Sequence, residues 1–170
     1  IVIANYPVKN GRIGNGVGLN TPKSLLNILH WLKDEGYDLG PGKLPKNSSE
    51  LMSLIIKART NDPESHNNKP LDYLSLKDYL KFWNQITKKP KTLIVERWGD
   101  PTKAVDLEES GFSINGISFG KIYVLIQPQR GYDTDSNKDI HSPDLPPPHR
   151  YIAQYHWLEN KFESNAIINL

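Results

Sequence analysis

Four glycines fall within eight residues near the start of the chain, and they limit what this region can form. Glycine permits backbone conformations and close approaches that other residues exclude, so the stretch 11–18 is expected to be a loop. It carries Arg12 and Asn15 between its glycines. The apolar run 1–4 before it is typical of a buried strand, and after it Thr21 can cap a helix whose first position is Pro22. The sequence therefore predicts a strand, a glycine loop and a helix over 22–35.

Three more helical regions are expected from apolar residues that recur at helical spacing. The sequence Asn47-Ser48-Ser49-Glu50 offers a cap for one helix over about 49–59, and Ser75 with an aspartate three residues later caps another. This second helix should fade at the Lys-Lys-Pro sequence 88–90, and the stretch 92–98 fits either a strand or a short helix. The last amphipathic pattern covers 151–162.

Strand signals lie between and after these helices. The Asn-Gly pair at 115–116 stands between Phe112-Ser113-Ile114 and Ile117-Ser118-Phe119 and predicts a tight hairpin, because Asn-Gly accepts the positive φ angles of a type I′ turn. A buried strand is expected at 122–127, and 166–170 is again strand-like. The alternation indicates an α/β fold: an open, mostly parallel sheet with flanking helices, of the three-layer Rossmann or flavodoxin type, with a β-hairpin. Ligands of such a sheet lie beyond the carboxyl ends of its strands, where the glycine loop is expected.

Charge and composition exclude several classes of function. The 21 basic and 19 acidic residues give a net charge of +2 without a basic stripe, which disfavours nucleic acid as the main partner. The chain has no cysteine, so disulfides, zinc thiolate sites and a cysteine nucleophile are excluded. The apolar runs are too short for a membrane span of about 20 residues, and we expect a soluble protein.

The glycine loop has two interpretations. Its backbone amides, Arg12 and the start of the following helix would together favour an anionic group such as a carboxylate or a phosphate. It is not a dinucleotide fingerprint, because Leu19 stands at the third glycine position, and it lacks the Gly-Lys-Ser/Thr of a Walker A loop. Alternatively, the glycines only permit tight packing of the strand against the helix. Spacing alone leaves both interpretations open.

Metal ligation has two possible sources in this sequence. Alternating acidic residues in 133–144 resemble the ligands of a calcium-binding EF-hand, but Lys138 replaces the required glycine, which favours a solvated acidic loop. His149 and His156 would lie about 10 Å apart on a helix, too far to share one metal ion. His156 shares a helical face with Glu159, a pair that is also common on polar helices without a metal.

Gln127 and Arg130 have structural and functional interpretations of similar weight, whereas core packing is favoured for three of the tryptophans. Gln127 and Arg130 end a buried strand, so they would either project into a crevice at the carboxyl edge of the sheet or form an ordinary turn. Trp31, Trp83 and Trp157 occupy apolar positions on predicted helices, and we expect them to pack in the core.

The glycine loop and its flanks resemble a known family, that of CobN and the large subunit of magnesium chelatase. The resemblance is carried by Asn5-Tyr6-Pro7, Gly11-Arg12-Ile13-Gly14-Asn15-Gly16-Val17-Gly18-Leu19 and Thr21-Pro22. It continues in the same order through Trp98-Gly99, Gln127-Pro128, Arg130-Gly131-Tyr132, Asp144-Leu145-Pro146-Pro147-Pro148-His149, Tyr151, Ala153, Tyr155 and Trp157-Leu158. Two positions depart from the pattern: Asn20 replaces the usual aspartate, and Asn169 stands where a histidine is expected.

This resemblance implies a cytoplasmic metal chelatase. In that family the large subunit binds a corrin or porphyrin precursor and inserts cobalt or magnesium, during cobalamin or chlorophyll biosynthesis, together with an AAA+ ATPase and its partner subunit. The metal ion is then a substrate, and ATP is used by the partner subunits. We expect 1–170 to be one α/β domain or subdomain of a much longer subunit, unable to insert metal by itself.

The resemblance and the chemistry of the side chains together nominate tetrapyrrole-binding residues. These candidates are Arg12, Asn15, Gly16, Gln127, Arg130 and His149. His149 and His156 are the candidates for a metal ligand, and no catalytic residue is assigned. An alternative of a different class is a non-catalytic α/β scaffold or interaction domain in which the glycine loop is purely structural.

Overall fold

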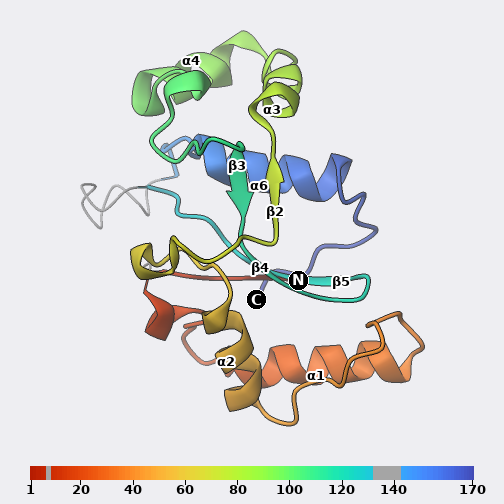
Figure 1. Cartoon of the computed structure of the whole chain (residues 1–170). Helices are drawn as coiled ribbons and strands as arrows, with labels where there is room; N and C mark the ends of the chain where they lie inside the picture. Colours follow the sequence, from red (N-terminus) through yellow and green to blue (C-terminus); the bar gives the residue numbers. More distant parts are fainter. Residues whose placement is uncertain (7–8, 132–142) are drawn as a thin grey trace. The chain divides into compact units, whose positions relative to one another are not determined.

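The chain has an α/β fold, as its sequence predicts, in a computed structural model that describes residues 1–6, 9–131 and 143–170 (Figure 1). It divides into two compact units, each assembled from segments that are far apart in the sequence. The first unit comprises Ile1–Leu71, Asn115–Gln127 and Ala166–Leu170, and the second comprises Asp72–Ile114 and Pro128–Asn165.

A small mixed sheet lies at the centre of the first unit, with the strand order β1-β5-β4. β1 (Val2–Ile3) runs parallel to β5 (Ile122–Ile126), whereas β4 (Gly116–Phe119) runs antiparallel to β5. The run 166–170 pairs with the other edge of β1: the Val2 amide donates to the Ile168 carbonyl at 2.8 Å. The sheet is mixed: the pairings of β1 with β5 and with Asn169 are parallel, and β4 is antiparallel because the chain returns through a tight turn between β4 and β5.

Two helices cover this sheet on the same side (Figure 1). α1 (Thr21–Asp34) is capped by Asn20, whose side-chain oxygen accepts from the Lys23 amide at 3.1 Å, one residue earlier than the expected threonine. α2 (Ser48–Lys57) is capped by Asn47, as its capping sequence predicts. Buried apolar side chains from both helices join the strands in one core: Ile3, Ile13, Leu25, Leu26, Leu29, Leu39, Leu44, Leu51, Ile55, Val124 and Ile126.

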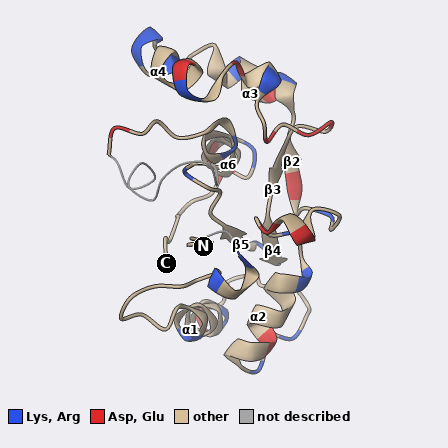
Figure 2. Ribbon diagram, turned by 90° about the vertical axis from the view of Figure 1, so that its left-hand side faces the viewer, with Lys and Arg blue, Asp and Glu red and all other residues tan. Residues whose placement is uncertain are grey.

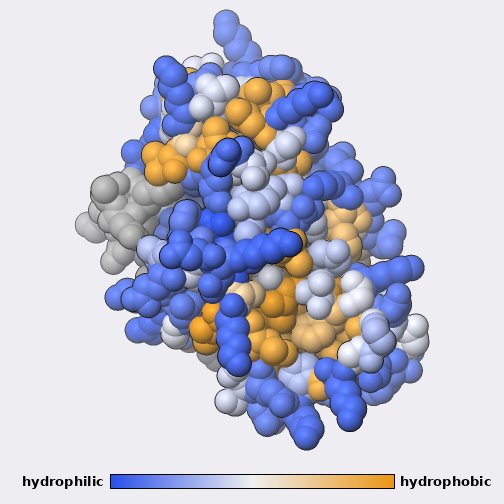
Figure 3. All heavy atoms as spheres, in the orientation of Figure 1, coloured by the Kyte–Doolittle hydropathy of each residue, from blue (hydrophilic) through white to orange (hydrophobic). Residues whose placement is uncertain are grey.

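Trp31 does not join this core, so its predicted burial is wrong. The side chain is 63% exposed, because it lies two residues beyond the buried Leu29 and therefore about 200° around the helix from it. Leu54 and Ile56 of α2 are also exposed, and apolar surface gathers in this region of the first unit in Figure 3. Basic and acidic residues are interspersed along the helices (Figure 2), in line with the small net charge.

In the part that the structure describes, the second unit combines a two-stranded sheet with three helices. β2 (Asp72–Leu74) and β3 (Phe112–Ile114) are antiparallel, and α6 (His149–Asn160) packs on both strands and on α3 (Leu76–Trp83). Ser75 caps α3 as expected. Trp83 and Trp157 are buried in this unit, which confirms their predicted core positions.

Short 3-10 helices cover Asn10–Arg12 and Pro63–Ser65 in the first unit and Pro101–Lys103 in the second.

The Lys-Lys-Pro sequence at 88–90 begins a helix rather than ending one. α4 spans Lys88–Trp98, so the ambiguous stretch 92–98 is helical. Pro90 is tolerated there because amides of the first helical turn have no partner within the helix. Gly99, at a φ of 83°, follows its last residue.

The predicted hairpin around the Asn-Gly pair is not formed. β3 pairs with β2, and β4 pairs with β5, so the two triplets that flank the Asn-Gly pair belong to different sheets. Gly116 has a φ of 148°, and a Cβ atom there would lie 2.2 Å from the carbonyl oxygen of Val124. The glycine is needed for close approach to β5 rather than for a type I′ turn.

Candidate functional site

The two candidate segments of the first unit leave the same edge of the sheet. β1 and β5 are parallel and in register, with Ile3 opposite Ile126, so their carboxyl ends coincide. The glycine loop follows β1, and Gln127 follows β5, with its amide donating to the Ile3 carbonyl at 2.9 Å. This is the edge at which an open α/β sheet binds its ligands.

The glycines of the loop serve two different purposes. Gly14 is buried at a φ of 69°, its amide donates to the Ala4 carbonyl at 2.6 Å, and a Cβ atom there would lie 3.2 Å from the Thr21 side chain. It fits the structural interpretation, because it lets the loop pack against the start of α1. Gly16 has ordinary space around it and no positive φ angle, so its backbone does not require glycine.

The outer part of the loop is exposed. Arg12, Asn15 and Gly16 are accessible to solvent, and the Val17 side chain is fully exposed. Among the residues that the structure describes, no side chain forms a hydrogen bond or ion pair with the Arg12 guanidinium. An accessible guanidinium in an exposed loop favours an anionic or carbonyl-bearing ligand.

A buried polar network holds the base of this loop. The Asn10 amide donates to Asp62 Oδ2 at 3.0 Å, and the Thr60 hydroxyl donates to Asn10 Oδ1 at 2.8 Å. Asn10 opens the 3-10 turn that carries Arg12. Thr60 is only 3% exposed and both bonds are partly buried, so they fix the position of the turn.

The same network ties the carboxyl edge of the sheet together. Asn115 donates to the Thr60 carbonyl at 2.6 Å, and Asn61 donates to the Gln127 carbonyl at 2.7 Å. The amide oxygens of Asn5 and Asn115 are buried, and no described residue donates to either. Sequence reasoning missed this network, because the bonded partners lie 50 or more residues apart in the chain.

His149 is built into the core of the second unit. It is 1% exposed, its Nδ1 lies 2.9 Å from the Tyr79 hydroxyl, and its Nε2 lies 3.0 Å from the Gly99 carbonyl oxygen. Because a carbonyl only accepts, Nε2 donates to Gly99 and Nδ1 accepts from Tyr79. Both ring nitrogens are therefore used, and a metal ion would have to displace one of these bonds. Burial raises the pKa of Tyr79 well above its usual value, with a smaller effect from Asp106.

Arg130 fixes the backbone of the proline-rich segment that leads to His149. Its guanidinium donates to the Leu145 carbonyl at 2.9 Å, and Trp98 Nε1 donates to the Pro146 carbonyl at 2.7 Å. Three pairs of residues that carry the family resemblance are thus bonded: Arg130 with Leu145, Trp98 with Pro146, and His149 with Gly99. Residues 132–142, which hold most of the EF-hand-like pattern, lie outside the described residues. Within the described ranges, no group of three or more acidic or histidine side chains could hold a metal ion.

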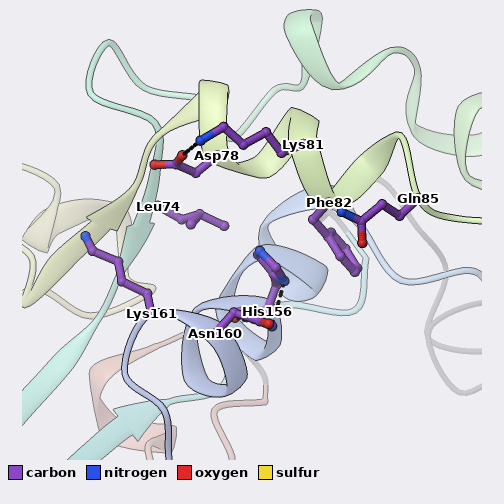
Figure 4. Close-up of a pocket in the computed structure, with 8 residues that line it drawn as sticks. All are labelled: Leu74, Asp78, Lys81, Phe82, Gln85, His156, Asn160 and Lys161. Atoms are coloured by element: carbon purple, nitrogen blue, oxygen red, sulfur yellow. Dashed lines mark hydrogen bonds and ion pairs between the residues drawn. The ribbon is translucent and has the colours of Figure 1, made fainter.

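His156 lies seven residues further along α6 and lines a pocket of about 340 Å³ between α3 and α6 (Figure 4). Its ring stacks on Phe82 at a centroid distance of 4.2 Å, and its Nδ1 lies 3.0 Å from the Asn160 amide nitrogen. Burial lowers the pKa of His156, although Glu159 and Asp78 act in the opposite direction.

The candidate residues are divided between the two units. Arg12, Asn15, Gly16 and Gln127 belong to the first unit. Arg130, His149 and His156 belong to the second.

No helix among the described residues is long and apolar enough to span a membrane.

Comparisons with known proteins agree with the resemblance seen in the sequence. The chain is 37% identical over 171 residues to the aerobic cobaltochelatase subunit CobN of Pseudomonas aeruginosa. It is 28% identical over 172 residues to the H subunit of magnesium chelatase from Chlorobaculum parvum. These alignments cover the whole chain but only 14% and 13% of the two relatives.

A solved structure has the same fold. The catalytic subunit of cobaltochelatase from Mycobacterium tuberculosis matches 99% of this chain with a TM-score of 0.78 and 28% sequence identity, over 14% of its own length. The sequence description of the CobN/magnesium chelatase family matches residues 1–170. The chain belongs to the CobN/magnesium chelatase family.

Proposed function

We propose that the chain is part of the tetrapyrrole-binding large subunit of an ATP-dependent cobaltochelatase or magnesium chelatase. The subunit inserts a divalent metal ion into a corrin or porphyrin precursor, in cobalamin or chlorophyll biosynthesis. The exposed Arg12 and loop amides at the carboxyl edge of the β1/β5 pair are the observation that carries this proposal. The family, and the relatives named as metal chelatases, support it.

The loop supplies binding rather than chemistry in this proposal. Tetrapyrroles carry carboxylate or carboxamide side chains at their periphery, and a guanidinium forms strong, oriented hydrogen bonds with such groups. Arg12 holds one of these groups, while Asn15 and the Gly16 amide supply weaker contacts. Gln127 lines the same edge, and Thr60 and Asp62 keep the loop base in place.

Metal insertion also requires removal of water from the ion and of two protons from the pyrrole nitrogens, tasks suited to histidines and carboxylates in a dry cleft. His149 and Arg130 have buried or backbone-bonding roles in their own unit, so we assign them to support rather than to the metal. The acid and base groups then come from other parts of the subunit. An AAA+ ATPase with its partner subunit supplies the energy of ATP hydrolysis.

Tetrapyrrole binding by the full-length protein tests this proposal. Arg12→Ala should weaken binding of a carboxylate-bearing tetrapyrrole about tenfold, as expected for loss of a charge-assisted hydrogen bond. Lys33→Ala, which removes an exposed cation at the other end of α1, is the matched control. Equal affinity of the wild-type and Arg12→Ala proteins would remove Arg12 from the binding site.

The scaffold alternative is favoured by one observation, the packing of Gly14 against α1. Two alanine substitutions separate the alternatives. Gly14→Ala should reduce stability under either interpretation, because the φ angle is positive and the space is filled. Gly16→Ala leaves the fold unchanged, so it should lower tetrapyrrole affinity only if the loop contacts the ligand. Absence of tetrapyrrole binding by the wild-type full-length protein would support the scaffold.

A further inference from the structure

The pocket between α3 and α6 belongs wholly to the second unit, and the proposed function does not use it. Its volume of about 340 Å³ is at the lower end of the range for small-molecule sites. Figure 4 shows Leu74 and Phe82 as apolar surface between polar groups from both helices. A pocket of this size and character suits a compact ligand with a short hydrocarbon portion.

Two lysines on opposite sides of the pocket have hydrogens to spare. Lys81 donates to Asp78 at 2.8 Å, and Lys161 donates to Asp72 and to the Tyr73 carbonyl, each at 2.9 Å. An ammonium group has three hydrogens, so two remain on Lys81 and one remains on Lys161. Both lysines are therefore positioned by their carboxylate partners without being saturated by them.

The histidine of the pocket adds a third donor. His156 Nδ1 accepts from the amide nitrogen of Asn160, so the ring hydrogen is on Nε2. Figure 4 shows Nε2 directed away from Asn160, into the space bounded by Leu74, Asp78 and Lys161. The Gln85 carboxamide, at the other end of the pocket, has no partner among the described residues.

The donor set selects the class of ligand. Lys81 and Lys161 are each paired with one carboxylate, Asp78 and Asp72, but their three remaining hydrogens and the Nε2 hydrogen of His156 leave the lining rich in hydrogen-bond donors. Asp78 and His156 are too few ligands for a metal ion. The lining contains no arginine, the side chain that best matches a phosphate. We propose that this pocket binds a small organic carboxylate, whose oxygens accept from Lys81, Lys161 and His156 and whose carbon chain lies on Leu74 and Phe82.

Calorimetric titration of the full-length protein with glutarate tests the proposal, with glutaramide as a neutral probe of equal length. The ionic strength is kept equal in both titrations. Glutarate should bind with a dissociation constant on the order of 1 mM, typical of a ligand with few atoms, and glutaramide at least tenfold more weakly. Equal binding of the two probes, or tighter binding of inorganic phosphate than of glutarate, would overturn the assignment.

Single substitutions locate the binding. Lys81→Gln should weaken glutarate binding about fivefold, as expected when one charged donor on an open wall is lost. Lys77→Gln, an exposed lysine on the same helix that does not line the pocket, should leave the affinity unchanged. His156→Phe keeps a ring against Phe82 and removes the Nε2 donor, so it should also weaken binding. Equal losses in the two lysine variants would show a nonspecific charge effect and refute the site.

These results are independent of the tetrapyrrole proposal. The pocket lies in the second unit, whereas Arg12 and the glycine loop lie in the first. If the wild-type protein bound the tetrapyrrole but not glutarate, the result would therefore count against the pocket alone.

Discussion

The Tyr79 hydroxyl lies 2.9 Å from Nδ1 of His149 in the interior of the second unit, where both side chains are almost completely buried. The two rings meet edge to face at a centroid distance of 5.8 Å, and Trp83 approaches His149 at 5.0 Å. One hydrogen bond thus joins α3 to α6 inside an aromatic cluster. A buried hydrogen bond of this kind is costly to break, because the remaining partner cannot turn to water.

Tyr79→Phe should therefore lower the free energy of unfolding by about 1–3 kcal/mol, since it leaves His149 Nδ1 buried without a donor. Urea denaturation, followed by tryptophan fluorescence, measures the change. Tyr37→Phe removes the same hydroxyl from an exposed side chain and should change stability by less than about 0.5 kcal/mol. Similar effects of the two substitutions would contradict the role of the Tyr79–His149 bond.

Thr60→Val should loosen the base of the glycine loop. The substitution keeps the shape of the side chain but removes the hydroxyl that donates to Asn10 and accepts from the Asp62 amide. We expect destabilisation of about 1–3 kcal/mol and faster hydrogen exchange in the turn that carries Arg12. Hydrogen exchange read by mass spectrometry on peptides from this turn provides the measurement.

The control for this substitution is Thr87→Val, since Thr87 is exposed and its side chain forms no capping bond. It should leave exchange in the turn unchanged. If Thr60→Val also left that exchange unchanged, the network would not hold the loop. Reduced tetrapyrrole affinity in Thr60→Val would in addition link the network to binding.

Gly116→Ala should be among the most damaging single substitutions in the first unit. An added methyl group would meet the Val124 carbonyl oxygen at 2.2 Å, and the φ of 148° disfavours any side chain. We expect a loss of stability above about 3 kcal/mol. Gly42→Ala, at a glycine with open space and no positive φ angle, should be tolerated. Thermal unfolding of both variants checks the contrast, and an unchanged melting temperature for Gly116→Ala would disprove the close approach.

Acid should weaken the second unit through Asp72. Burial alone would raise the pKa of Asp72, but hydrogen bonds from Lys161, Trp157 and the Tyr73 amide, with the Lys161 charge, lower it on balance. A lowered pKa stabilises the folded state above the unfolded-state value of 3.8, and this contribution is lost as pH falls through the folded-state value.

Urea denaturation at several pH values between about 5 and 2 tests this dependence. Asp72→Asn should be less stable than the wild type at the upper end of that range, and the difference should shrink as the pH falls. Asp34→Asn, at an exposed aspartate on α1, should follow the wild-type curve. If acid lowered the stability of the wild type and of Asp72→Asn equally, the effect would come from other carboxylates.

Local signals predicted much of the secondary structure. Asn47 and Ser75 cap their helices as expected, because a cap depends on residues within one turn. The α/β class and the strand–loop–helix unit at the start of the chain also follow from local pattern. Pro90 was misread because the same residue is acceptable at the start of a helix and disruptive within it.

Long-range partners could not be inferred in this way. β3 pairs with a strand almost 40 residues earlier, so the Asn-Gly pair beside it was misread as a turn. Thr60 reaches Asn10 and Asn115, and no periodicity in the sequence connects these positions. The same limit applies to His149, since the two groups that occupy its ring nitrogens come from segments 70 and 50 residues away.

The interleaving of the two units has a consequence for synthesis on the ribosome. The chain passes from one unit to the other at four points, after residues 71, 114, 127 and 165. One edge of β1 forms its hydrogen bonds with residues 168–170, which pair with Val2 and Ala4. The first segment of the first unit is therefore translated before the second unit, and its last segment is translated after it. The first unit cannot complete its fold during synthesis until the second unit has also been translated.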